Sequence, residues 1–144
     1  MIFLTLPPYR ILYPYVLINA NRPEHGLRYI MKHRRGVRMV IIDSGVEIFR
    51  NPARFEYPGG SVYWIDRLVY LYRLVKNIVG HDNVWVTCPD YPDDYHPKSL
   101  WISEEITNIE RTVANVRMCI GKYPEVNWLI PVQGHYRKPH TLLR

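Results

Sequence analysis

The sequence predicts an α/β fold in which strand–helix–strand units build a parallel sheet. Short apolar runs of strand type alternate with longer segments whose apolar residues recur every three or four positions. Turn-forming glycine, proline and asparagine lie between them. Strands that alternate with helices form parallel sheets through right-handed crossovers. With 144 residues, the chain has the size of one domain, so we expect a single α/β domain over residues 1–144 in the order β-α-β-α-β-α-β.

The first unit begins with an apolar, extended run at residues 11–18. Asn21 and Pro23 then predict the N-cap and first turn of a helix, and Gly36 predicts its end. Residues 38–42 are a nearly continuous apolar run, which is typical of a strand buried on both faces. The apolar stripe expected on the helix consists of Leu27, Ile30 and Met31.

A loop rich in proline and glycine follows at residues 51–60, and then a long helical pattern that ends at Gly80. Residues 84–87 predict the third strand. The apolar positions of the helix lie three or four apart: Val62, Ile65, Leu68, Val69, Tyr72, Val75 and Val79.

A further helix is predicted between Ser103, its expected N-cap, and Gly121. Two glutamates directly after Ser103 suit the first turn of a helix, where the backbone dipole favours negative charge. Residues 128–132 predict the fourth strand. The apolar positions of this helix are Ile106, Ile109, Val113, Val116 and Ile120.

The net charge of +6 favours an anionic partner, with nucleic acid as the first candidate. Cys88 and Cys119 form no CxxC pair, so the sequence predicts no zinc site. Two widely spaced thiols suit a reducing cytoplasm. The N-terminus lacks the pattern of a signal peptide, and no apolar run has the length of a membrane span.

Polar groups follow three of the predicted strands. Because parallel strands present their carboxyl ends at one edge of the sheet, where α/β proteins bind ligands, we expect these groups to converge. Aspartate, glycine and proline are also turn formers, which is the alternative reason for their presence. The three groups are Asp43-Ser44-Gly45, Asp90-Tyr91-Pro92 and Gln133-Gly134.

These residue types suit the recognition of guanine. A carboxylate accepts two parallel hydrogen bonds, and the Watson–Crick edge of guanine offers N1–H and the N2 amino group. A glutamine amide and a glycine N–H can serve the O6 and N7 acceptors. A second carboxylate nearby can move protons on the base.

The ordered trio resembles the motifs of the tRNA-guanine transglycosylase superfamily, which includes the queuine and archaeosine enzymes and those that place 7-deazaguanines in DNA. The resemblance covers residues 37–134 and implies half of a (β/α)8, or TIM, barrel. It assigns contact with the base and proton transfer to Asp43, base binding to Ser44 and Gly45, the guanine-like edge to Asp90, and the carbonyl side to Gln133 and Gly134.

In the family, a further aspartate from the second half of the barrel attacks the sugar and displaces guanine, and no cofactor is implied. Val46, Glu47 and Ile48 depart from the family pattern after its first motif. A whole barrel takes about 250 residues. We therefore expect a fragment, a reduced homologue or a half-barrel completed by a second chain, and no turnover by this chain alone.

Two basic clusters suit contact with the phosphates of tRNA or DNA. Cations at a solvated helix end are the alternative explanation for these clusters. The first cluster contains Lys32, Arg34, Arg35 and Arg38. The second contains Arg137, Lys138, His140 and Arg144, of which Arg137, Lys138 and Arg144 are assigned to nucleic-acid binding.

Two other functions stay open. Asp43 and Asp90, with Asp93 and Asp94, could bind Mg²⁺ for nuclease or phosphatase chemistry, although we expect Asp93 and Asp94 to point into solvent. The chain could also be a non-catalytic nucleic-acid-binding module. The choice between tRNA and DNA, the particular deazaguanine and the oligomeric state stay open as well.

Overall fold

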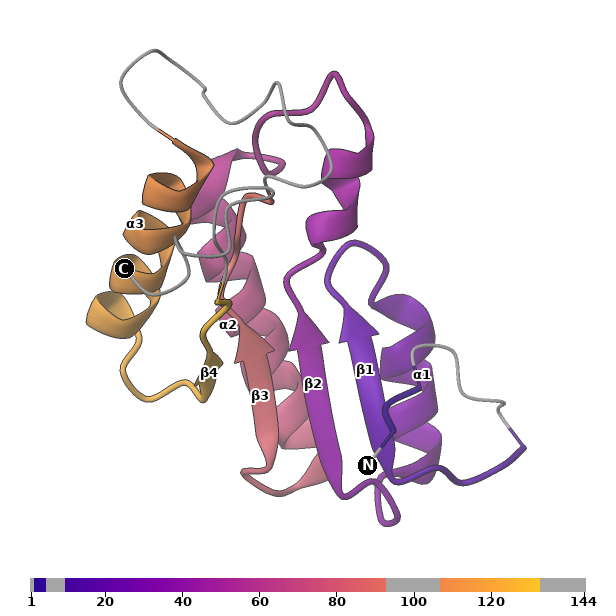
Figure 1. Ribbon diagram of the computed structural model, residues 1–144. Coiled ribbons are helices and arrows are strands. Elements are labelled where there is room, and N and C mark those ends of the chain that lie inside the picture. Colours follow the sequence, from indigo (N-terminus) through magenta and orange to yellow (C-terminus); the bar gives the residue numbers. More distant parts are fainter. Residues whose placement is uncertain (1, 5–9, 93–106, 133–144) are drawn as a thin grey trace.

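The computed structural model describes residues 2–4, 10–92 and 107–132 (Figure 1). One parallel sheet has the strand order β1-β2-β3-β4, which confirms the predicted α/β class. The strands are β1 (Tyr15–Asn19), β2 (Met39–Asp43), β3 (Val84–Thr87) and β4 (Trp128–Leu129). The helices are α1 (Glu24–His33), the 3-10 helix η1 (Val46–Arg50), α2 (Gly60–Val79) and α3 (Asn108–Lys122).

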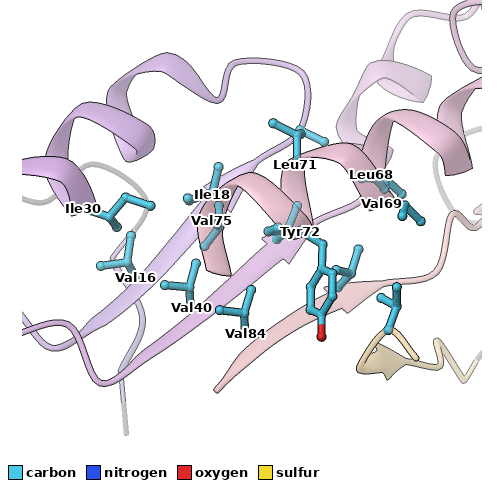
Figure 2. Packing of buried hydrophobic residues seen from close by; sticks show 14 of the residues in the cluster. Val16, Ile18, Ile30, Val40, Leu68, Val69, Leu71, Tyr72, Val75 and Val84 are labelled. Atoms are coloured by element: carbon cyan, nitrogen blue, oxygen red, sulfur yellow. The ribbon is translucent and has the colours of Figure 1, made fainter. Parts of the chain in front are cut away.

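The face of the sheet that α1 and α2 cover carries the core. Val16, Val40 and Val84 come from three adjacent strands and are fully buried beneath Ile30 of α1 and Val75 of α2 (Figure 2). Each such side chain contributes about 1.5–3 kcal/mol when it leaves water. The helices therefore dock on the sheet through a continuous apolar layer.

Burial alternates along the strands, so the two faces of the sheet differ. In β2, Val40 and Ile42 are buried, whereas Met39 and Ile41 are half-buried. The apolar run at residues 38–42 predicted burial on both faces, and this is wrong for the second face. The side chains on that face include Leu17 of β1, which is also half-buried.

Helix α2 follows the prediction closely. Leu68 and Val75 are buried at the expected spacing, and Gly80 ends the helix with a left-handed φ of 73° while its N–H donates to the Lys76 carbonyl at 2.9 Å. Val62 is the exception, because half of its side chain surface is exposed. Among the described helices, none is both long enough and apolar enough to cross a membrane.

Helix α1 begins differently from the prediction. Pro23, not Asn21, occupies the N-cap, and no side chain caps the helix there. The Asn21 side chain instead donates to the Gly45 carbonyl at 2.8 Å, so a contact with the turn that follows β2 takes the group that a cap would use. Ile30 is buried as expected, whereas Met31 is exposed.

Helix α3 begins at Asn108 with Thr107 as its N-cap, and Ser103 lies outside the described residues. Thr107 and Glu110 form a capping box: the Thr107 hydroxyl accepts from the Glu110 N–H at 3.2 Å, and the Glu110 carboxylate accepts from the Thr107 N–H at 2.8 Å. The predicted apolar stripe is not the buried face, because Val113 and Ile120 are exposed. The buried residues of α3 are Asn108, Thr112, Asn115 and Cys119.

Candidate functional site

The carboxyl ends of β1, β2 and β3 lie at the same end of the sheet, next to η1 (Figure 1). Asp43 is the last residue of β2 and pairs with Asn19, the last residue of β1. Asp90 follows β3 by three residues. The predicted polar groups of the second and third strands are therefore brought to one edge of the sheet, where parallel α/β proteins bind ligands.

A tight turn fixes the Asp43 side chain. Its Oδ1 accepts a hydrogen bond of 2.8 Å from the Gly45 N–H. Gly45 has a left-handed φ of 83°, and a Cβ atom there would lie 2.6 Å from the Asn21 side chain. Both the positive φ and this close approach require glycine, so the Asp-Ser-Gly sequence matches the backbone that it has to form.

A second carboxylate, that of Glu47, lies beside this turn. Asn21 Nδ2 donates to Glu47 Oε1 at 2.8 Å, and Asn19 Nδ2 donates to the same oxygen. The Asn19 side chain in turn accepts from the Asn21 N–H at 2.8 Å. Two amides from the end of β1 thus hold one carboxylate of η1 in place.

The surroundings of Asp43 favour its protonated form. Partial burial raises the pKa of the Asp43 carboxyl above its ordinary value, and the nearby negative charge of Glu47 raises it further. The Gly45 N–H acts in the opposite direction because it stabilises the carboxylate. A carboxyl group whose pKa is raised in this way is suited to hold and release a proton.

The Asp90 segment is joined to the end of β2 through Ser44. The buried Ser44 hydroxyl donates to Asp90 Oδ1 at 3.4 Å, a long hydrogen bond. Trp64 Nε1 donates to the Ser44 carbonyl at 2.8 Å, and the Tyr57 hydroxyl donates to the Asp90 carbonyl at 2.9 Å. Tyr57 and Trp64 stack with their ring centroids 5.5 Å apart, so one aromatic pair supports both strand ends.

Burial raises the pKa of Tyr57 well above its ordinary value, and the negative charge of Asp90 adds to the effect. Its hydroxyl therefore stays protonated and available as a donor.

Helix α3 holds the backbone on either side of Asp90. The Tyr91 N–H donates to the Thr112 hydroxyl at 2.9 Å, and Asn115 Nδ2 donates to the Pro89 carbonyl at 3.1 Å. Thr112 and Asn115 are buried, and each satisfies a backbone group that no β-ladder reaches. The polar face of α3 is therefore the face that positions Asp90.

The Tyr91 side chain is enclosed by charged partners. The Arg111 guanidinium lies 3.4 Å from the centroid of the Tyr91 ring and forms an ion pair of 2.9 Å with Glu56. The Tyr91 hydroxyl donates to the other carboxylate oxygen of Glu56. Burial and that hydrogen bond raise the pKa of Tyr91 to about 12, so its hydroxyl is a donor at neutral pH.

A hollow beside Tyr91 has a volume of about 10 Å³ and is lined in part by Phe49, Phe55 and Arg111. This is room for about one water molecule. A base therefore does not fit into this hollow, and neither Asp43 nor Asp90 lines it.

The remaining predicted site residues lie outside the described residues. They are Gln133 and Gly134, which the sequence places after the fourth predicted strand, the basic residues Arg137, Lys138 and Arg144, and the carboxylates Asp93 and Asp94. Of the predicted set, the structure brings together Asp43, Ser44, Gly45 and Asp90.

No group of three or more histidine, cysteine, aspartate or glutamate side chains that could hold a metal ion occurs among the described residues. Asp43 and Asp90 are the described members of the carboxylate set proposed for Mg²⁺, and Asp90 is bound by Ser44, the residue next to Asp43.

Sequence reasoning missed Glu47, Asn19 and the Tyr57–Trp64 pair. Asn19 and Asn21 follow a buried strand, as the other polar groups do, and this pattern was the available signal for the first strand. Tyr57 and Trp64 lie in a loop and a helix, and nothing in their spacing indicates contact with a strand end.

Comparison of this chain with protein-family models, with curated proteins and with solved structures found no match.

Proposed function

We propose that this chain binds a guanine-type base and contributes to the exchange of guanine for a 7-deazaguanine in tRNA or DNA. The observation that carries the proposal is the contact between Ser44 Oγ and Asp90 Oδ1 at 3.4 Å. It joins two of the three motifs that resemble the transglycosylases, although they are 46 positions apart in sequence. This closeness is what a shared base site requires.

The strand order supports the same proposal. Four parallel strands follow one another without a reversal, and α1 and α2 cover the same face. Consecutive units of a βα barrel have this arrangement, whereas doubly wound sheets reverse their order. We propose that the sheet forms half of a (β/α)8 barrel of the transglycosylase type, completed by further βα units or by a second chain.

The two aspartates have separate roles in this proposal. The Asp90 carboxylate accepts hydrogen bonds from N1–H and the N2 amino group of the base. Asp43, whose pKa is raised by burial and by Glu47, moves a proton on the base as it leaves or enters. Gln133 and Gly134 take the carbonyl side of the base, as the resemblance implies.

The covalent step belongs to a nucleophile that has no counterpart within residues 37–134. In the related enzymes, an aspartate bonds to the anomeric carbon as the bond to guanine breaks, and the incoming deazaguanine then displaces that aspartate. This is the two-step logic of retaining glycosidases. For this chain, the proposal covers recognition of the base and proton transfer.

Thermal unfolding with added base tests the proposal. Guanine and 7-deazaguanine should raise the Tm, because a ligand that binds the folded state stabilises it by about 2.7 kcal/mol at a concentration about 100-fold above its Kd. Adenine, which lacks the matching donor pair, should shift the Tm much less. Asp90→Asn should remove the guanine effect, because an amide cannot accept both hydrogen bonds.

Asp66→Asn is the matched control, since Asp66 is a carboxylate on α2 that is paired with Lys122 at 2.8 Å. It should keep the response to guanine. Equal shifts with guanine and adenine, or none with either, would contradict the proposal. A shift with Mg²⁺ alone would instead support the nuclease or phosphatase, and binding of nucleic acid without any response to a base would support a non-catalytic module.

A further inference from the structure

The end of the sheet opposite the candidate site carries a basic hollow. It has a volume of about 460 Å³ and lies where α1 ends and the chain turns into β2. In Figure 1 this turn is at the end where β1 and β2 begin. A strand of five residues, such as β2, is about 16 Å long at about 3.3 Å per residue, so the hollow and Asp43 are well separated.

Positive charge is concentrated in this part of the chain. Between positions 20 and 42 the sequence has six lysines and arginines and a single acid, Glu24, which lies in the first turn of α1. This segment thus accounts for five of the six net positive charges. Lys32, Arg34 and Arg35 line the hollow and are exposed.

These cations have no acidic partner within the described part of the chain. Other surface cations do: Arg73, Lys76 and Lys122 pair with Glu125, Asp82 and Asp66 at 3.0, 2.7 and 2.8 Å. The three cations of the hollow also lie at the C-terminal end of α1, where the helix dipole attracts positive charge. That attraction explains why cations are tolerated there, but it leaves their donor groups open to a ligand.

The backbone beneath the cations is held firmly. Gly36 N–H donates to the His33 carbonyl at 2.8 Å, and Arg38 N–H donates to the Pro14 carbonyl at 2.8 Å. The Asn83 side chain donates to the Arg38 carbonyl, also at 2.8 Å. The turn is thus tied to both neighbouring elements of the sheet, so less ordering is needed when a ligand binds.

We propose that this hollow, with Lys32, Arg34 and Arg35, is a second contact surface for the phosphate backbone of a nucleic-acid duplex. Guanidinium groups form forked hydrogen bonds with phosphate oxygens, and adjacent phosphates along a backbone suit several cations in one turn. No phenylalanine, tyrosine or tryptophan lines the hollow, and the ring of its one histidine, His33, already packs against Tyr29 with the ring centroids 4.7 Å apart. The hollow therefore lacks the aromatic platform on which proteins stack unpaired bases. The contact is therefore independent of sequence.

An anionic membrane is a poorer match for this surface. Helices that lie on membranes insert an apolar face between lipid headgroups. The apolar side of α1, with Tyr29 and Ile30, is fully buried against the sheet. Leu12 and Met31 are the apolar members of the hollow and are exposed, but they are two side chains beside three cations and offer little apolar area for insertion.

The choice of nucleic acid as partner rests on the proposed function, but the surface and its test are separate from the base site. Binding of the full chain to an end-labelled DNA duplex and an RNA duplex of arbitrary sequence is followed by fluorescence anisotropy over a range of NaCl concentrations. The test variant combines Lys32→Gln, Arg34→Gln and Arg35→Gln. The matched control removes the same charge elsewhere by combining Arg73→Gln, Lys76→Gln and Lys122→Gln, and circular dichroism checks that both variants fold.

The test variant should bind at least about tenfold more weakly at low salt. The slope of the logarithm of its binding constant against the logarithm of the NaCl concentration should become less negative by about 0.9 for each phosphate that the variant no longer neutralises. The control should bind no more than about threefold more weakly than the natural chain, through net charge alone. Comparison of the DNA and RNA duplexes identifies which of them is the better partner.

Equal losses of affinity in the two variants, an unchanged test variant or no binding by the natural chain would each overturn the proposal. So would binding of the natural chain to phosphatidylserine vesicles in preference to either duplex. Failure of the base-binding proposal would show in the response of the Tm to guanine and leave this result unchanged.

Discussion

The carboxyl ends of β2 and β3 each present an aspartate, but different parts of the chain hold the two. At the end of β2, Asp43 is held by Gly45, and the adjacent Glu47 is held by Asn19 and Asn21 at the end of the neighbouring strand. At the end of β3, Asp90 depends on groups from distant segments. They are Ser44, Tyr57, Thr112 and Asn115.

Because different contacts hold them, the positions of the two carboxylates should respond differently to mutations. The geometry around Asp43 follows from one turn and one strand pair, so it should persist when α3 is perturbed. The position of Asp90 depends on the docking of α2 and α3 against the sheet. Changes in the two helices should therefore weaken the proposed recognition of a base by Asp90 before they affect the proton transfer proposed for Asp43.

The largest effect is expected at Tyr57, which lies between the carboxyl ends of β2 and β3. Tyr57→Ala removes a fully buried ring and the hydroxyl bound to the Asp90 carbonyl, and should lower the free energy of unfolding by about 3–5 kcal/mol. Urea unfolding measures the loss. Tyr70→Ala is the control, because two thirds of the Tyr70 surface is exposed, and it should change stability by about 0.5 kcal/mol or less. Similar losses in both variants would refute a special role for Tyr57.

A smaller effect confined to the end of β3 is expected from Thr112→Val. The substitution keeps the shape of the side chain but leaves the buried Tyr91 N–H without its acceptor, at a cost of about 1–3 kcal/mol. The response of the Tm to guanine should weaken as well. Thr112→Ser retains the hydroxyl and should keep most of that response. If valine and serine behave alike, the hydrogen bond does not position Asp90.

The end of β2 is tested by Asn21→Ala, which removes one of the two amides that hold Glu47 and the bond to the Gly45 carbonyl. We expect a loss of about 1 kcal/mol, since these groups are partly exposed to water. Asn77→Ala, on the exposed side of α2, should cause no loss. If Asn21→Ala weakened the response of the Tm to guanine as strongly as Thr112→Val does, the carboxyl ends of β2 and β3 would not be independent.

The smallest effect concerns pH. Because burial and Glu47 raise the pKa of Asp43, the folded state binds its proton more tightly than the unfolded state does. The stability that this provides is complete below the ordinary aspartate value of 3.8 and is lost as the pH rises through the raised pKa. The stability of Asp43→Asn relative to the natural chain should therefore increase from acidic to neutral pH.

Urea unfolding across that pH range measures the trend for Asp43→Asn. Asp66→Asn should show the opposite sign, because hydrogen bonds from Lys122 and Tyr123 lower the pKa of Asp66. A flat difference for Asp43→Asn would contradict a raised pKa of Asp43 in the folded state.

Some elements could be predicted because interactions between neighbouring residues determine them. The strand at residues 84–87 and the end of α2 at Gly80 match the prediction, since an apolar run between turn residues and a glycine after a periodic stripe are local signals. The convergence of Asp43 and Asp90 was also predictable, because parallel strands end at one edge.

The prediction was wrong for the buried face of α3. Apolar periodicity pointed to Val113 and Ile120, yet Thr112 and Asn115 are buried because the backbone around Asp90 needs partners that β3 does not supply. The same applies to Asn21, which has the chemistry of an N-cap but binds Glu47 and Gly45. A hydrogen bond between distant segments leaves no periodic signal.

The sequence by itself determined the α/β class, the order of its elements and the two aspartates at the strand ends, because periodicity and turn chemistry act over a few neighbouring residues. Only the tertiary structure decided which side chains surround those aspartates. Glu47 beside Asp43, the aromatic pair beneath Ser44 and the polar face of α3 behind Asp90 all depend on buried polar groups finding partners once the helices dock on the sheet.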